Sequence, residues 1–107
     1  MNFMKIMQQA QTMQKKMAEL QERAGQYLVT GTAGNGLVEI TMTCKGQIQD
    51  VKIKPEAMDP SDPSMLEDLV KAALNTARTM ADDTLAEETR KMMRELGLPE
   101  NMQLPTS

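Results

Sequence analysis

Lysine and arginine side chains near the two ends of the chain are the groups in this sequence with the clearest chemistry to offer. Residues 1–24 contain four of these cations and two carboxylates, a local charge of +2, although the whole chain carries −3. Lys and Arg neutralise DNA phosphates and release their counterions, which is the main source of affinity for duplex DNA. The candidate phosphate contacts are therefore Lys5, Lys15, Lys16, Arg23, Arg90, Lys91 and Arg94.

A solvated helix face is the ordinary alternative for these cations. Mixed charges on an exposed helix usually pair with opposite charges three or four positions away, as Glu87 and Lys91 can. Residues 59–96 carry nine acids and five cations, so this part of the chain is acidic. A generic nucleic-acid binder usually has a basic balance. The charge pattern alone therefore leaves both interpretations open.

The amino-acid composition lacks the residues that the common catalytic sites require. The chain has no histidine and a single cysteine, Cys44, which excludes Ser-His-Asp and Cys-His catalysis, the usual zinc ligand sets and an intrachain disulfide. No nucleophile–base set is visible, so we expect no enzyme activity, no cofactor, no metal and no small-molecule substrate. Without a secretory signal or a membrane-spanning apolar run, we expect a cytoplasmic protein that has no membrane contact.

Two long helices are predicted to carry the cations. In residues 3–24, apolar side chains repeat every seven residues in two series offset by three, which is the pattern of a coiled-coil seam. The second predicted helix covers residues 65–96, with Ser64 and Glu67 as a capping box at its start. Both helices are therefore expected to be amphipathic.

The segment between the helices changes from a helical to an alternating period. Residues 26–55 predict three strands, and Gly34-Asn35-Gly36 predicts the hairpin turn between the first two. Ile48, Val51 and Ile53 do not share one parity, so a bulge is expected near Gln49-Asp50.

The expected fold is therefore α+β, with an α-β-β-β-α protomer built around a three-stranded antiparallel sheet. A single domain is predicted for residues 1–97, followed by a flexible C-terminal tail over residues 98–107. The helical pattern can run to Leu96, where Gly97 and Pro99 stop it.

These helices are too long for so small a domain. At about 1.5 Å per residue, residues 65–96 span about 48 Å, whereas a compact domain of this size has a radius of gyration of about 13 Å. The helices must therefore project beyond the sheet. Their seam packs either on the other helix of the chain or on a second copy, and we expect a homodimer. Its predicted interface residues are Phe3, Ile6, Met13, Met17 and Leu20.

Three segments resemble the YbaB/EbfC family of bacterial nucleoid-associated proteins: QAQTMQKKMAELQE, VTGTAGNGLVEI and MLEDLVKAALNTA. The resemblance covers about residues 4–90. It implies a homodimer whose helices project like a pair of tweezers and bind double-stranded DNA with those arms. It also implies a location at the nucleoid, with effects on chromosome compaction and gene expression.

A prefoldin-like chaperone or adaptor is the alternative function. Its coiled-coil arms would hold client proteins, and Met4 and Met7 at one tip, opposite Met92 and Met93, would form an adaptable apolar grip. Salt separates the two functions, because DNA affinity falls linearly with salt on a logarithmic scale and client binding through methionines does not.

Overall fold

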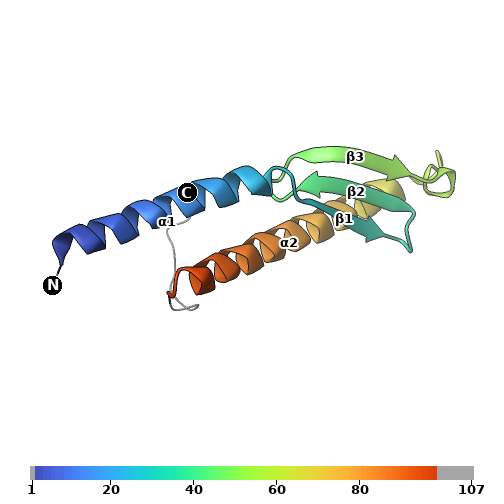
Figure 1. Cartoon of the computed structure of the whole chain (residues 1–107). Coiled ribbons are helices and arrows are strands. Elements are labelled where there is room, and N and C mark those ends of the chain that lie inside the picture. The colour runs from blue at the N-terminus through green and yellow to red at the C-terminus, as the bar shows by residue number, and fades with distance from the viewer. Residues whose placement is uncertain (1, 99–107) are drawn as a thin grey trace.

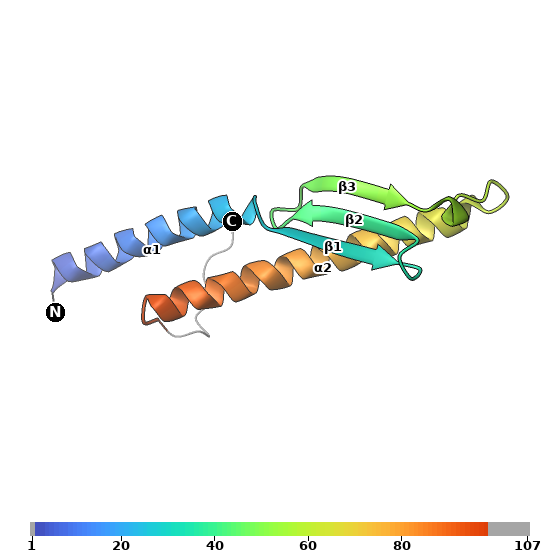
Figure 2. The same cartoon turned by 45° about the vertical axis from the view of Figure 1, so that its right-hand side comes forward.

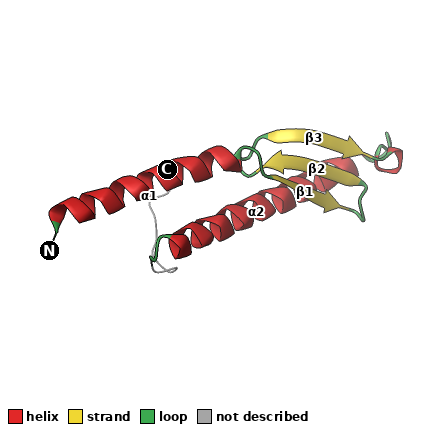
Figure 3. Ribbon diagram, viewed as in Figure 1, coloured by secondary structure: helices red, strands yellow, loops and turns green. Residues whose placement is uncertain are grey.

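The computed structural model describes residues 2–98 and confirms the predicted order of elements. These are α1 (Phe3–Ala24), β1 (Leu28–Ala33), β2 (Val38–Thr43), β3 (Ile48–Ile53), the 3-10 turn η1 (Pro55–Ala57) and α2 (Pro63–Glu95). In the elongated α+β arrangement, α1 extends from one end of the sheet, and α2 runs along the sheet and on beside α1 (Figures 1 and 3). From residue 99 onward, the predicted C-terminal tail lies outside the described residues.

The three strands form one antiparallel sheet in the order β1-β2-β3. Gly34, Asn35 and Gly36 all have positive φ, as the predicted hairpin turn requires. The predicted bulge is also confirmed, because Thr41 pairs with Asp50 while Met42 pairs with Ile48. Gln49 is the extra residue.

The bulge restores a common orientation to the apolar residues of β3. Directly paired residues of antiparallel strands face the same side of a sheet. Ile48, Val51 and Ile53 pair with Met42, Ile40 and Val38, whose side chains are buried on the face that α2 covers. All three apolar residues of β3 therefore point to the helix side of the sheet.

Small residues bring α2 close to β1. A Cβ atom on Gly31 would lie 2.4 Å from both the carbonyl oxygen of Ala73 and the backbone nitrogen of Ala77. Ala73 and Ala77 are fully buried in this contact. The helix therefore lies over β1 and β2, with which it shares most of its sheet contacts, and β3 lies beyond it (Figure 2).

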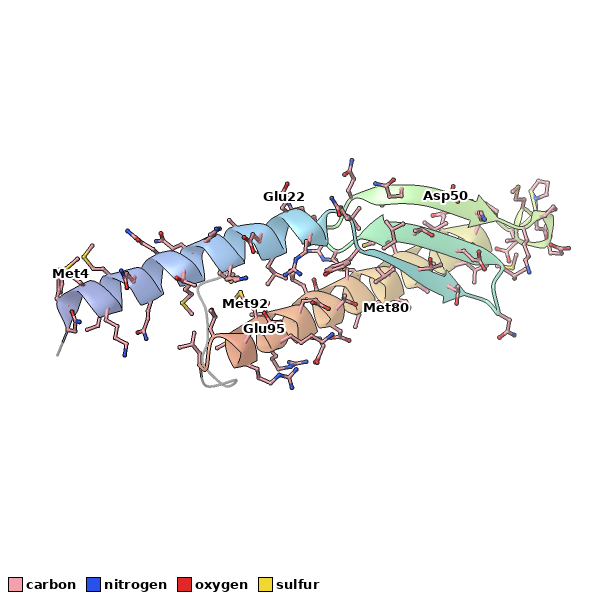
Figure 4. The ribbon with its side chains drawn as sticks, viewed as in Figure 1. Met4, Glu22, Asp50, Met80, Met92 and Glu95 are labelled. Atoms are coloured by element: carbon pink, nitrogen blue, oxygen red, sulfur yellow. The ribbon has the colours of Figure 1, made fainter. Side chains whose placement is uncertain are left out.

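The two helices extend past the sheet as one arm. Leu20 of α1 is fully buried against Met92 and Met93 of α2, and Met92 lies between the two helices in Figure 4. Beyond this contact α1 continues past the end of α2 to its tip, where Phe3 is 72% exposed. The chain measures 70 × 22 × 19 Å with a radius of gyration of 19.1 Å, so the overhang expected from helix length is confirmed.

The helix starts have different causes. The Asn2 side chain accepts hydrogen bonds from the backbone nitrogens of Met4 and Lys5 and thereby caps α1. The predicted capping box of α2 is wrong. The helix begins at Pro63, and Ser64 donates its hydroxyl hydrogen bond to Asp62. Proline suits the first helical position, since its φ is preset and no partner is needed for its nitrogen.

Candidate nucleic-acid interface

One side of α1 carries a row of cations. Lys5, Lys16 and Arg23 are 11 and 7 residues apart, which is close to three and two full helical turns, so they lie on the same side of the helix. Lys5 and Arg23 are exposed and Lys16 is partly exposed. At about 1.5 Å per residue the row is about 27 Å long. We call these three residues the α1 cation row; Lys15 lies to one side of it.

Little on α1 neutralises this row. Lys16 lies 3.8 Å from Glu19, and both side chains are more than 40% exposed. Such an exposed pair contributes little and exchanges readily with other ions. Within residues 2–98, no carboxylate lies within ion-pair distance of Lys5, Lys15 or Arg23. The charges of α1 are therefore available to an anionic partner.

The base of the arm holds two cations that the sequence analysis did not select. Lys45 lies in the turn between β2 and β3, and its Cδ is 3.6 Å from the Cβ position of Gly25, two residues after Arg23. Arg78 of α2 reaches the same turn, with its Nη1 3.9 Å from the Cβ position of Gly46. Asp82 lies 3.6 Å from Arg78, with both side chains largely exposed. The fold therefore extends the positive surface beyond the α1 cation row.

Near the end of α2, every predicted cation lies beside a carboxylate. Arg90 donates two hydrogen bonds to Glu87, at 2.7 and 3.2 Å, and Arg94 lies 3.6 Å from the same carboxylate. Hydrogen bonding and attraction from Arg90 lower the pKa of Glu87, with smaller contributions from Arg94 and Lys91. Lys91 in turn lies 3.5 Å from Glu88.

The last turns of α2 are therefore close to neutral in sum. Their three cations are balanced by three carboxylates, those of Glu87, Glu88 and Glu95. A phosphate approaching Arg90, Lys91 or Arg94 would compete with carboxylates already in place. In place of the expected i,i+4 pair of Glu87 with Lys91, the structure has i,i+3 pairs of Arg90 with Glu87 and of Lys91 with Glu88. The end of α2 therefore has the kind of charge pairing that a solvated helix face predicts.

A groove of about 470 Å³ lies between α1 and the residues that follow α2. Lys5, Gln9 and Met13 line it from α1, and Leu96 and Leu98 line it from the other side. The helices are thus antiparallel neighbours, and Lys5 comes near the end of α2. The groove mixes cationic, amide and apolar groups, so it adds hydrogen-bond donors to the positive side of the arm.

We also looked among the described residues for a reactive thiol, a metal-binding group and a membrane-spanning helix. Cys44 is buried in the core, and burial raises the pKa of its thiol despite a hydrogen bond with Thr84. Within residues 2–98 there is no group of three or more metal-binding side chains. In the same range, neither helix has both the length and the apolar character that crossing a bilayer requires.

Fold and surface together define an α+β protein that carries a projecting pair of helices with positive charge along one of them. The sequence profile of the YbaB/EbfC DNA-binding family matches residues 1–96, and the chain belongs to this family. The family resemblance of its three sequence segments is thereby confirmed.

Relatives of nearly equal length share about two fifths of the sequence. A nucleoid-associated protein of Paramagnetospirillum magneticum is 44% identical over 104 residues, which is 97% of each chain. A nucleoid-associated protein of Pelotomaculum thermopropionicum is 40% identical over 98 residues, covering 92% of this chain and 93% of the relative.

A solved structure supports the fold. The crystal structure of an uncharacterized protein from Helicobacter pylori superimposes with a TM-score of 0.74 at 19% identity. It covers 87% of this chain and 98% of that protein. The α-β-β-β-α architecture is therefore shared, while the assignment of particular cations to a DNA contact stays a prediction.

Proposed function

We propose that this protein is a nucleoid-associated protein that binds double-stranded DNA through phosphate contacts, without catalysis. The family is described as DNA-binding, and its relatives bear the name nucleoid-associated. The observation that carries the proposal is the α1 cation row, which lies on a projecting helix with little neutralisation by carboxylates. Phosphate contacts of this kind position a protein on DNA without reading its sequence.

In this proposal α1 is the main contact, and the α2 cations act second. The residues of α1 up to Ala24 carry a net charge of +2, whereas the cations near the end of α2 are balanced by neighbouring carboxylates. Lys45 and Arg78 extend the same positive side toward the sheet. Arg90, Lys91 and Arg94 would contribute after their side chains turn from Glu87 and Glu88.

The proposed working unit is a homodimer. Two copies present two arms and double the number of phosphates that one particle neutralises. Arms held at a fixed separation can grip one duplex or connect two, which would compact the chromosome and change gene expression. The corresponding location is the nucleoid.

The test is the salt dependence of duplex DNA binding, measured by fluorescence anisotropy of a labelled duplex. The slope of log affinity against log salt is about −0.9 for each phosphate neutralised. Replacing Lys5→Gln and Arg23→Gln removes four charges from a dimer, so we expect the slope to become shallower by about 3.6. Affinity should fall at every salt concentration.

The matched control removes the same number of charges elsewhere. Lys52→Gln with Lys54→Gln changes β3 and the residue after it, far from the arm (Figure 1). Its salt slope should equal that of the parent protein. An equal loss in both double variants would contradict the assignment to α1, and salt-independent binding by the parent would contradict phosphate contact altogether.

One observation favours the chaperone alternative. The tip of α1 exposes Phe3, Met4, Ile6 and Met7, each by more than 40%, and such a surface can hold apolar segments of other proteins. An aggregation assay run over the same range of salt concentrations separates the two functions. Suppression of client aggregation that persists at high salt, together with no DNA binding at low salt, would favour the chaperone alternative.

A further inference from the structure

Two arginines near the end of α2 lie on the side of this helix that faces away from α1. Met92 lies between the two helices and is 3% exposed, so it marks the side of α2 that faces α1 (Figure 4). Arg90 and Arg94 are two positions before and after Met92, and at about 100° per residue both lie on the opposite side of the helix. Glu87 lies about one turn before Arg90, on the same side. We call Glu87, Arg90 and Arg94 the α2 outer stripe.

One carboxylate holds both guanidinium groups of this stripe. Arg90 donates hydrogen bonds from Nε and Nη2 to Oε2 of Glu87, at 3.2 and 2.7 Å, and Nη2 of Arg94 lies 3.6 Å from the other oxygen, Oε1. Two positive charges and one negative charge leave the stripe with an excess of one positive charge. All three side chains are half-exposed, so an anion from solution can reach them.

A DNA phosphate can take the place of this carboxylate. An exposed ion pair is weak, because water and salt screen it. A guanidinium group binds phosphate with the same two-pronged geometry with which it binds a carboxylate. Duplex DNA presents many phosphates at once and releases counterions when they are neutralised, and one glutamate side chain gains neither advantage. DNA can therefore compete with Glu87 for the two arginines.

We infer that the α2 outer stripe is a second phosphate-binding surface of the arm, and that Glu87 keeps its affinity low by competing with DNA for Arg90 and Arg94. The inference rests on the proposed function, in which α1 makes the main contact, and it adds the residue that limits the contribution of α2. Because the stripe faces away from α1, it binds phosphates other than those that the α1 cation row binds.

Glu95 provides a matched control for Glu87. It is the last residue of α2, its side chain is exposed, and it forms no ion pair with any cation among residues 2–98. Glu95→Gln therefore removes the same charge from the same end of the helix as Glu87→Gln does. Only Glu87→Gln removes the carboxylate that Arg90 and Arg94 share.

The experiment measures binding of a labelled duplex by fluorescence anisotropy over a range of salt concentrations, for the parent, Glu87→Gln and Glu95→Gln. We expect Glu87→Gln to raise the affinity at low salt at least about threefold, as the loss of an exposed competing pair should. Its slope of log affinity against log salt should steepen by up to about 1.8 for each bound arm, or 0.9 for each phosphate gained. Glu95→Gln should raise the affinity less and keep the slope of the parent.

A double-mutant cycle shows whether Glu87 acts through Arg90. Arg90→Gln should lower the affinity more in the Glu87→Gln protein than in the parent, and the combined variant should lose most of the gain. All three substitutions replace exposed or half-exposed side chains on a helix, and glutamine is a good helix former. Each variant is therefore expected to fold, and circular dichroism checks this.

Two results would overturn the inference while the proposed function stands. One is an equal affinity and an equal salt slope of Glu87→Gln and Glu95→Gln. The other is an additive effect of Glu87→Gln and Arg90→Gln. A failure of both the parent and Glu87→Gln to bind DNA would overturn the proposed function, and this inference with it. Binding by the parent therefore distinguishes the two failures.

Discussion

Gly31 is the residue on which the placement of α2 depends. A side chain at this position would have to occupy space already filled by the backbone of Ala73 and Ala77. Backbone atoms of a long helix cannot shift individually, so the whole of α2 would have to move away from β1. The same close approach places α2 over β1 and β2, so the absence of a side chain at Gly31 influences both the core and the exposure of β3.

Gly31→Ala is expected to lower the free energy of unfolding by about 1–3 kcal/mol or more, as overpacking of a filled core does. Urea unfolding followed by circular dichroism measures this. Gly25→Ala is the matched control, since Gly25 has a φ of −70°, which any residue adopts, and its Cβ would make ordinary contacts of 3.4 and 3.6 Å. A Gly31→Ala protein as stable as the control would show that α2 is not held by this contact.

At the scale of elements, the arm depends on one small cluster. Before its last residue, α1 packs mainly on α2, and this contact centres on Leu20, Met92 and Met93, whereas Ala24 at its end is buried in the core with Met42 and Ala77. The sheet and the first half of α2 have their own core around Val38, Ile40 and Ala73. The part of α1 before Ala24 can therefore separate from α2 without unfolding the sheet, because its few buried side chains lie in the cluster of Leu20 and not in the core of the sheet.

Leu20→Ala should detach α1 from α2 locally. Replacing a fully buried leucine by alanine costs about 2–5 kcal/mol of stability. Because the contact between α1 and α2 is small, we expect this loss to be enough to separate the two helices. Hydrogen exchange should show faster exchange of the α1 amides, while the amides of β2 keep their protection. Gln21→Ala, at the exposed neighbouring position, should leave both unchanged. Equal acceleration in α1 and β2 would mean that arm and sheet unfold as one unit.

For the molecule as a whole, the proposed function makes the strength of DNA binding depend on the number of arms. The chain is 70 Å long, and the cations of α1 lie along the arm that projects from the sheet (Figure 1). A second copy whose contact leaves the arms uncovered would double this cationic surface.

In the proposed function, a single copy should still bind DNA, because its α1 cation row is intact. With one arm in place of two, its slope of log affinity against log salt should be about half that of the dimer. Anisotropy titrations at protein concentrations where sedimentation shows dimer and monomer measure this. Equal slopes under the two conditions would show that one arm already makes all the phosphate contacts.

Local patterns were sufficient for much of the fold. The seven-residue repeat of α1, the Gly34-Asn35-Gly36 turn and the bulge at Gln49 could all be predicted, because each depends on residues close together in the chain. The start of α2 was misjudged, since Pro63 and Ser64 offered competing signals for the same helix end. The sequence analysis did not select Lys45 and Arg78, because they are more than 30 residues apart in the chain. They come together only when α2 packs beside the turn between β2 and β3.

The sequence by itself determined the order of elements, the overhanging length of the helices and the surplus of cations on the first helix, since periodicity, helix rise and charge are local properties. The tertiary structure alone decided which cations are balanced by carboxylates, that Leu20 is buried within its own chain, and that β3 lacks a cover. These facts depend on how closely α2 approaches β1, and that distance depends on contacts between residues far apart in the chain.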